Sequence, residues 1–151
     1  MWKTILVPHD FSSCANQASA LARDVAKIHG ARLVLLHVAE LPAMLGPTAT
    51  VVPDEGGAPI SVRDYALRSS EARLDDLAAR LRVDGVEVST VAALGNAATE
   101  IADCATREQV DLIVMGTNGR TGLAHVVLGS VTERVVRHST VPVLTVRVTE
   151  A

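Results

Sequence analysis

Residues 32–38 read Arg-Leu-Val-Leu-Leu-His-Val, and the four residues Leu33-Val34-Leu35-Leu36 are apolar without interruption. A strand that faces water on one side alternates apolar and polar residues, whereas an unbroken apolar run is typical of a strand buried on both faces. Strands of that kind occur mainly in parallel sheets whose two faces are covered by helices. This stretch therefore predicts an α/β fold.

The neighbouring segments extend the pattern. Lys3–Val7 is a short apolar run that ends at Pro8, and Ser13–His29 repeats apolar residues at helical spacing up to Gly30, a typical helix-ending residue. Further along the chain we expect three more helices, from Ser61 to about Val83, over Ala97–Arg107 and over Ser130–His138, with Asn96 as the N-cap of the second. Each of these helices is followed by a predicted strand: Val86–Val91, Asp111–Met115 and Pro142–Val148. Two of these helices begin with sequences that resemble capping boxes, Ser61-Val62-Arg63-Asp64 and Ser130-Val131-Thr132-Glu133.

Strands that are separated by helices pair in parallel through right-handed crossovers. The order of elements thus predicts a five-stranded, parallel, doubly wound sheet with helices on both faces, Rossmann-like or flavodoxin-like, in one domain over residues 1–151. In the helix over Ala97–Arg107 we expect Ile101, Ala102 and Ala105 to face inward, and the helix over Ser130–His138 carries Val131, Val135 and Val136.

One long stretch, Ala39–Ile60, shows no periodicity. It contains four prolines and three glycines: Pro42, Pro47, Pro53, Pro59, Gly46, Gly56 and Gly57. Loops of this length are uncommon in compact domains and often serve as lids or remain disordered. We expect this loop to be irregular and mobile in the free protein, with partial ordering on a ligand or partner.

Composition excludes several classes of function. The chain has 151 residues, of which 48% are hydrophobic and 2% aromatic, and its formal net charge is −3. This charge gives no basic surplus for nucleic acid, and the few aromatics offer no stacking platform for bases. No apolar run is long enough for a membrane span or a secretion signal. The two cysteines, Cys14 and Cys104, are far apart in sequence and fit a reduced cytoplasmic setting.

In doubly wound sheets, ligands bind beyond the carboxyl ends of the strands. After the predicted strand Asp111–Met115 comes a glycine-rich segment, Gly116–Gly122, and Gly129-Ser130 then opens a helix. Glycines allow backbone N–H groups to approach an anion, and a helix N-terminus attracts phosphate. The pattern favours a phosphate site, but neither the P-loop string nor the dinucleotide fingerprint is present. The alternative is that these glycines only form a turn and that Ser130 is only an N-cap.

The spacing of Gly116, Gly119 and Gly129-Ser130 resembles the nucleotide-binding signature of the universal stress protein family. Other segments resemble the family in the same order: Ile5–Ser12, Leu35–Val38, Asp111–Gly116 and Val141–Leu144. The resemblance covers nearly the whole chain apart from the loop Ala39–Ile60.

This resemblance implies a fold like that of the adenine nucleotide alpha hydrolases and a stress-response regulatory protein that binds ATP, with Mg²⁺ or Mn²⁺ held through the phosphates. It implies that Asp10 contacts the ribose, that Pro8, the backbone of Val38 and Met115 line the adenine slot, and that Gly116 lies against the ribose. The phosphates would rest on Gly119, Gly129, Ser130 and Val131, and Arg120 offers a further donor. His9 stands where the family more often has Thr or Val, so it also belongs to the expected site.

Three readings of function remain open. The first is ATP binding without a catalytic set, with at most weak ATPase activity. The second is a slow ATP hydrolase in which Asp10 or His9 aids the metal or the water. The third is a nucleotide-free scaffold that acts as a homodimer through its last strand, Val141–Val148, an edge open to pairing. Asp10 itself has a structural alternative, because an aspartate before a helix is also a common cap.

Overall fold

The structure, a computed structural model, describes residues 1–117 and 128–148. Five strands form the main sheet: β1 (Thr4–Pro8), β2 (Arg32–Ala39), β5 (Val88–Leu94), β6 (Leu112–Gly116) and β7 (Val143–Val146). Four helices connect them: α1 (Ser13–His29), α2 (Val62–Leu81), α3 (Ala97–Arg107) and α4 (Ser130–His138). A short 3₁₀ helix, η1 (Val83–Gly85), follows α2.

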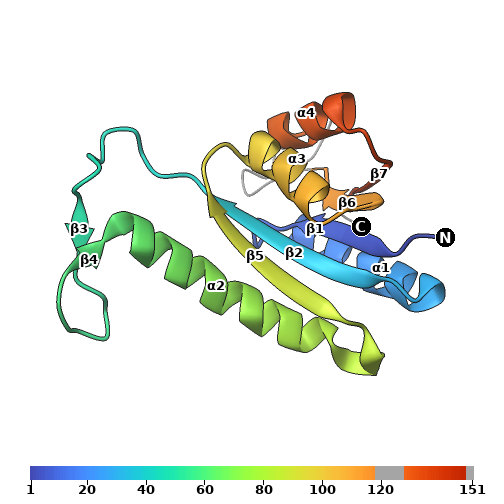
Figure 1. Cartoon of the computed structure of the whole chain (residues 1–151), viewed down its shortest axis with the longest axis horizontal. Coiled ribbons are helices and arrows are strands. Elements are labelled where there is room, and N and C mark those ends of the chain that lie inside the picture. Colours follow the sequence, from blue (N-terminus) through green and yellow to red (C-terminus); the bar gives the residue numbers. More distant parts are fainter. Residues whose placement is uncertain (118–127, 149–151) are drawn as a thin grey trace.

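The main sheet has the order β5-β2-β1-β6-β7, and every pairing in it is parallel. From β1 the chain first builds outward through β2 to β5, and it then returns to the other side of β1 to add β6 and β7 (Figure 1). This order confirms the predicted five-stranded, parallel, doubly wound sheet. The direction of building reverses between β1 and β6, which is the position where such sheets bind ligands.

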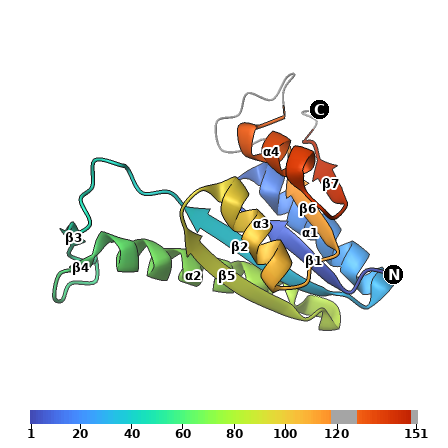
Figure 2. The ribbon, with the colours of Figure 1, turned by 45° about the horizontal axis from the view of Figure 1, so that its top comes forward.

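Alternating residues of the strands face two separate apolar layers. Ile5 and Val7 pack with α1 and α2 in one layer, whereas Leu6 packs with α3 and α4 in the other. Leu33 and Leu35 of β2 belong to the first layer, with Val34 and Leu36 in the second, so the unbroken apolar run is buried on both sides. Figure 2 shows α3 and α4 together on one face of the sheet.

The helix ends follow their local sequences. Ser12 is the N-cap of α1, Ser61 that of α2 and Asn96 that of α3, and each side chain accepts a hydrogen bond from the backbone N–H three residues ahead. Gly30 ends α1 in the left-handed conformation, with φ of 65°. The caps predicted at Asn96 and Ser61 and the stop at Gly30 are therefore confirmed.

One residue predicted to face inward, Ala102, and one predicted cap, Ser130, are wrong. Ala102 of α3 is exposed, as is Val136 of α4, because each helix packs only a narrow stripe against its face of the sheet. The buried apolar residues of these stripes are Ile101, Cys104 and Val135. The N-cap of α4 is Gly129 and makes no side-chain cap hydrogen bond, so Ser130 is the first residue of the helix rather than the cap of a capping box.

Residues 40–61 form an arm that extends away from the main sheet (Figures 1 and 2). Within it, β3 (Thr50–Val51) and β4 (Ile60–Ser61) pair antiparallel, so the expectation of a wholly irregular loop is wrong at these two short strands. Each of these strands has only two residues, which is too short for an alternation of apolar and polar residues to be recognised in the sequence. The mobility expected of this stretch stays a prediction.

Within the described ranges, no helix combines the length and the hydropathy that crossing a membrane requires. Cys14 and Cys104 are both buried and neither forms a disulfide.

Candidate functional site

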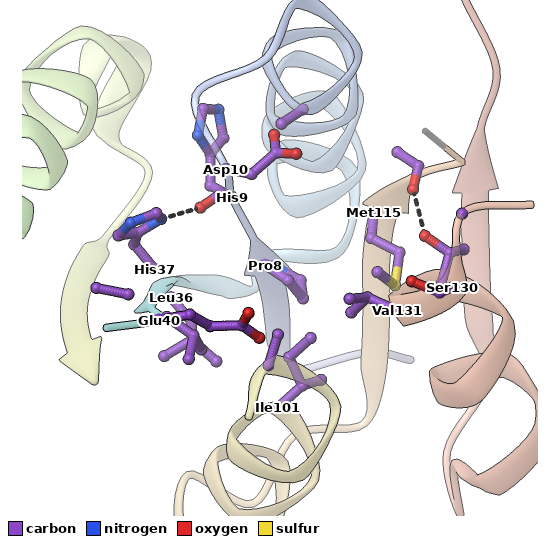
Figure 3. A pocket seen from close by; sticks show the side chains of 17 residues that line it. Pro8, His9, Asp10, Leu36, His37, Glu40, Ile101, Met115, Ser130 and Val131 are labelled. Carbon is purple, nitrogen blue, oxygen red and sulfur yellow. Dashed lines mark hydrogen bonds between the residues drawn. The ribbon is translucent and has the colours of Figure 1, made fainter. Parts of the chain in front are cut away.

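A cavity of about 650 Å³ opens at the carboxyl ends of β2, β1 and β6 (Figure 3). The N-terminal turns of α3 and α4 complete its walls. Of the residues that the structure describes, seventeen line it: Pro8, His9, Asp10, Ala15, Leu36, His37, Val38, Ala39, Glu40, Ala97, Ile101, Met115, Gly116, Gly129, Ser130, Val131 and Thr132. The cavity thus lies at the point where the strand order reverses.

Nine residues predicted from the sequence meet at this cavity: Pro8, His9, Asp10, Val38, Met115, Gly116, Gly129, Ser130 and Val131. They come from four separate segments of the chain. Gly119 and Arg120, the other two, lie outside the described residues. Three further lining residues, Glu40, Ile101 and Thr132, were not predicted from the sequence. Their positions could have indicated them, because Glu40 directly follows a strand and the other two lie near the starts of helices.

The backbone of Val38 faces the cavity because the neighbouring strand has ended. Within a parallel strand, successive residues direct their N–H and C=O groups to opposite sides. Leu36 accepts a hydrogen bond from the N–H of His9, whereas Ala39 accepts one from Gly95 beside β5. Val38 is in phase with Leu36, so its N–H and C=O point to the side of β1, which stops at Pro8. The edge of this peptide therefore offers one donor and one acceptor beside the cavity.

Asp10 holds the turn between β1 and α1. One of its carboxylate oxygens, Oδ1, accepts a hydrogen bond of 3.0 Å from the N–H of Ser12. Ser12, not Asp10, caps α1, since the Ser12 hydroxyl oxygen accepts from the N–H of Ala15 at 3.1 Å. The alternative of Asp10 as the helix cap is thus wrong, and its carboxyl group lies at the cavity wall (Figure 3).

His9 is a buried and neutral histidine. The residue is only 4% exposed, and its Nδ1 accepts a hydrogen bond of 3.0 Å from the N–H of Phe11, which places the ring proton on Nε2. Burial lowers the pKa of His9 to about 4, against the opposing influence of Asp10 and Asn16. The carbonyl oxygen of His9 accepts a hydrogen bond of 2.7 Å from Nδ1 of His37 on β2 (Figure 3). The two histidines therefore fix the backbone that carries Asp10.

Phe11 links this turn to α2. Its backbone has a positive φ of 64°, which is uncommon for a bulky residue. The ring lies 5.1 Å from the ring of His9 and 4.7 Å from that of His37, measured between centroids. The guanidinium carbon of Arg73 on α2 lies 3.9 Å from the centre of the Phe11 ring, a cation–π contact. The strained turn beside the cavity is thus braced from β2 and from α2.

On the opposite side, α4 is tied to the end of β6. The buried hydroxyl of Thr132 donates a hydrogen bond of 2.9 Å to the carbonyl oxygen of Gly116. The N–H of Gly129 donates to the carbonyl oxygen of Thr117 at 2.7 Å. These two bonds aim the N-terminus of α4, with its unpaired N–H groups and positive dipole end, at the cavity.

The cavity therefore has two chemically different ends. The β2 end combines apolar walls with the backbone edge of Val38, whereas the α4 end offers the N-terminus of a helix. Asp10 lies between them, at the end of the central strand β1. Such an arrangement suits a ligand with a flat, partly apolar group at one end and an anion at the other. Among the described residues, no three His, Cys, Asp or Glu side chains form a group that could hold a metal ion.

Comparison with known proteins gives consistent matches. The model of the universal stress protein family matches residues 1–147. A universal stress protein of Thermus aquaticus is 36% identical over 149 residues, covering 97% of this chain and 100% of the relative. One from Methanocaldococcus jannaschii is 31% identical over 147 residues, covering 97% of this chain and 83% of the relative.

Solved structures share the fold. A hypothetical protein of Methanocaldococcus jannaschii superposes with a TM-score of 0.80 at 26% identity, covering 100% of this chain and 99% of the other. A universal stress protein solved in complex with cAMP has a TM-score of 0.71 at 20% identity, covering 98% and 99%. Another, from Archaeoglobus fulgidus in complex with dAMP, has a TM-score of 0.67 at 17% identity, covering 97% and 98%.

The family model spans residues 1–147, and relatives of more than 30% identity match 97% of the chain. The chain belongs to the universal stress protein family.

Proposed function

We propose that this protein binds an adenine nucleotide, ATP in particular, and regulates a stress response through that binding. The observation that carries the proposal is the cavity at the strand-order reversal, where the edge of the Val38 peptide and the N-terminus of α4 stand at opposite ends. Adenine carries a hydrogen-bond donor and an acceptor side by side, which suits a backbone edge, and phosphates suit a helix N-terminus. The Asp10 carboxylate lies between these ends, where a ribose would offer its hydroxyl groups.

Two kinds of comparison support this assignment. The family consists of stress-response proteins, and two fold neighbours are complexes with cAMP and dAMP, both of them adenine nucleotides. The proposed phosphate contacts are those of Gly129, Ser130 and Val131, to which Gly119 and Arg120 would be added. A divalent cation, Mg²⁺ or Mn²⁺, would be held chiefly by the phosphate oxygens, because the described residues form no metal-binding group of their own.

The test is direct. Protein purified without added ligand is denatured, and the released small molecules are separated by ion-exchange chromatography. We expect ATP in the supernatant, and saturable ATP binding to ligand-free protein by titration calorimetry with Mg²⁺ present. A chain that is folded and free of ligand but shows no heat of binding up to millimolar ATP contradicts the proposal.

We propose binding rather than turnover. In the described part of the chain, two imidazoles line the cavity, and both use Nδ1 in structural contacts, that of His9 with the Phe11 N–H and that of His37 with the His9 carbonyl. We expect phosphate to be released from ATP at a rate close to that measured in buffer without the protein. Fast steady-state release that is lost in Asp10→Asn, with ATP binding retained, would establish the hydrolase reading instead.

We also propose a homodimer formed through β7 and a cytoplasmic setting. β7 is the last strand of the sheet on its side, with Leu144 and Thr145 exposed, and among the described residues no strand pairs with its outer edge, which would serve a second copy. Two buried, unpaired cysteines suit a reducing compartment.

A further inference from the structure

We propose that Glu40 makes the site selective for a purine that carries an amino group at its six-position, so that adenine is accepted and 6-oxo purines are disfavoured. This inference rests on the proposed nucleotide function and adds to it a residue that determines specificity. Glu40 directly follows β2 and lines the cavity, and its carboxylate points inward toward Pro8 and Ile101 (Figure 3).

The charge of Glu40 indicates which part of a ligand it meets. Among the described residues that line the cavity there are two carboxylates, Asp10 and Glu40, and no lysine or arginine. A carboxylate repels phosphate, and Glu40 lies at the β2 end, separated from α4 by β1 and β6 in the sheet order. Glu40 is therefore placed against the end of the ligand that carries no charge, the base.

A carboxylate only accepts hydrogen bonds, so it favours a base that presents N–H groups to it. The edge of the Val38 peptide, two residues earlier, supplies one donor and one acceptor. Adenine matches that edge with its ring N1 and one hydrogen of its six-amino group, which leaves the second amino hydrogen for Glu40. A 6-oxo purine places an acceptor oxygen at the same position, where it meets both the Val38 carbonyl and the Glu40 carboxylate.

The carbonyl oxygen of Val38 belongs to a partly buried residue, and an acceptor shielded from water that loses its donor is left without compensation. Glu40 is exposed, so it adds to this discrimination by repelling the 6-oxo oxygen and by accepting from the amino group of adenine. We expect wild-type protein to bind ATP at least about tenfold more tightly than inosine triphosphate, whose base differs at this position. The ratio of the two dissociation constants is the appropriate readout, since removal of a negative charge shifts the affinity for both triphosphates together.

The experiment measures that ratio by calorimetry for the wild type and three variants. Glu40→Ala removes the acceptor, and we expect the ratio to fall at least about fivefold. Glu40→Gln replaces one acceptor oxygen with an NH2 donor that can bind the 6-oxo oxygen, and we expect the ratio to fall at least as far as in Glu40→Ala. Glu55→Ala removes the same charge from the exposed arm, away from the cavity, and should retain the wild-type ratio.

The outcomes separate the two claims. If neither triphosphate binds the wild type, the proposed function fails, and the specificity of Glu40 fails with it. If both bind and Glu40→Ala leaves the ratio unchanged, or if Glu55→Ala changes it equally, the role of Glu40 is overturned while nucleotide binding stands.

Discussion

A β-carbon placed on Gly116 would lie 2.7 Å from the sulfur of Cys14 and 3.2 Å from the backbone carbonyl carbon of the same residue. The first turn of α1 thus packs directly against the last residue of β6. The Cys14 thiol also donates a hydrogen bond of 3.2 Å to the carbonyl oxygen of Val146, which joins α1 to β7. A glycine is required at position 116 for packing, whatever the ligand.

We predict that Gly116→Ala lowers the free energy of unfolding by about 1–3 kcal/mol, because the added methyl group has no room beside backbone atoms. Urea denaturation measures the loss. Gly46→Ala is the matched control, since nothing lies within 4 Å of a β-carbon there and its backbone is not left-handed. Equal stability of Gly116→Ala and wild type would show that α1 and β6 are less closely packed than described.

His9 should make the protein less stable in acid. Its pKa is about 4 in the folded state and about 6.5 in an unfolded chain, so the unfolded state binds more protons between these values and stability falls as the pH decreases. The loss is of order 2 kcal/mol at pH 5. Unfolding measured at pH 7.5 and pH 5 should show this decrease in the wild type and a smaller one in His9→Gln. An equal decrease in both proteins would assign the acid sensitivity to other groups.

The cap of α3 offers a test of local structure. The Asn96 side-chain oxygen accepts a hydrogen bond of 3.1 Å from the N–H of Thr99. We predict that Asn96→Ala lowers the free energy of unfolding by about 1 kcal/mol and that Asn96→Asp, which keeps the acceptor, loses much less. Thermal and urea unfolding of the pair check this, and similar losses in both variants would contradict the capping role.

For the phosphate end of the site, we predict that Gly129→Val weakens ATP binding at least about tenfold, or 1.4 kcal/mol, because a branched side chain blocks approach to the N-terminus of α4. We expect the same of Gly119→Val. Titration calorimetry measures the affinity, circular dichroism checks the fold, and Gly46→Val in the exposed arm serves as control. Unchanged affinity in a folded Gly129→Val protein would refute the phosphate contact.

The edge strand can be blocked without disturbing its own sheet. Val146 accepts a hydrogen bond from Thr117 on the β6 side, so Thr145, one residue earlier, directs its N–H outward. We predict that Thr145→Pro abolishes the proposed dimer while Thr145→Ala retains it, as measured by light scattering after size exclusion. A wild-type protein that remains monomeric at high micromolar concentration contradicts dimerisation.

The architecture could be predicted from the sequence because a strand buried on both faces needs apolar residues at every position, as in the unbroken run Leu33–Leu36. It was less informative about boundaries. The strand predicted over Val86–Val91 runs from Val88 to Leu94, since Ala92, Ala93 and Leu94 have little strand preference of their own and pair with His37, Val38 and Ala39 across the sheet.

For the candidate site, the predictable part was the position of residues after strands and at helix starts. The contacts that organise the site were not predictable, because they join residues distant in sequence. The hydrogen bond from Thr132 to Gly116 depends on how α4 packs against the sheet, and the contact of Arg73 with Phe11 depends on how α2 packs. No local sequence pattern indicates how a helix packs against the sheet.

The central position of β1 has a consequence for synthesis on the ribosome. β1 pairs with β6, with Ile5 opposite Leu112, and the N–H of Lys3 donates to the Asp111 carboxylate at 2.9 Å. Residues 4–8 emerge long before residues 112–116, so the middle strand of the sheet keeps one unpaired edge while most of the chain is translated. Contacts across such sequence distances form slowly, and a nascent chain with this topology should depend on the late strand to complete its fold.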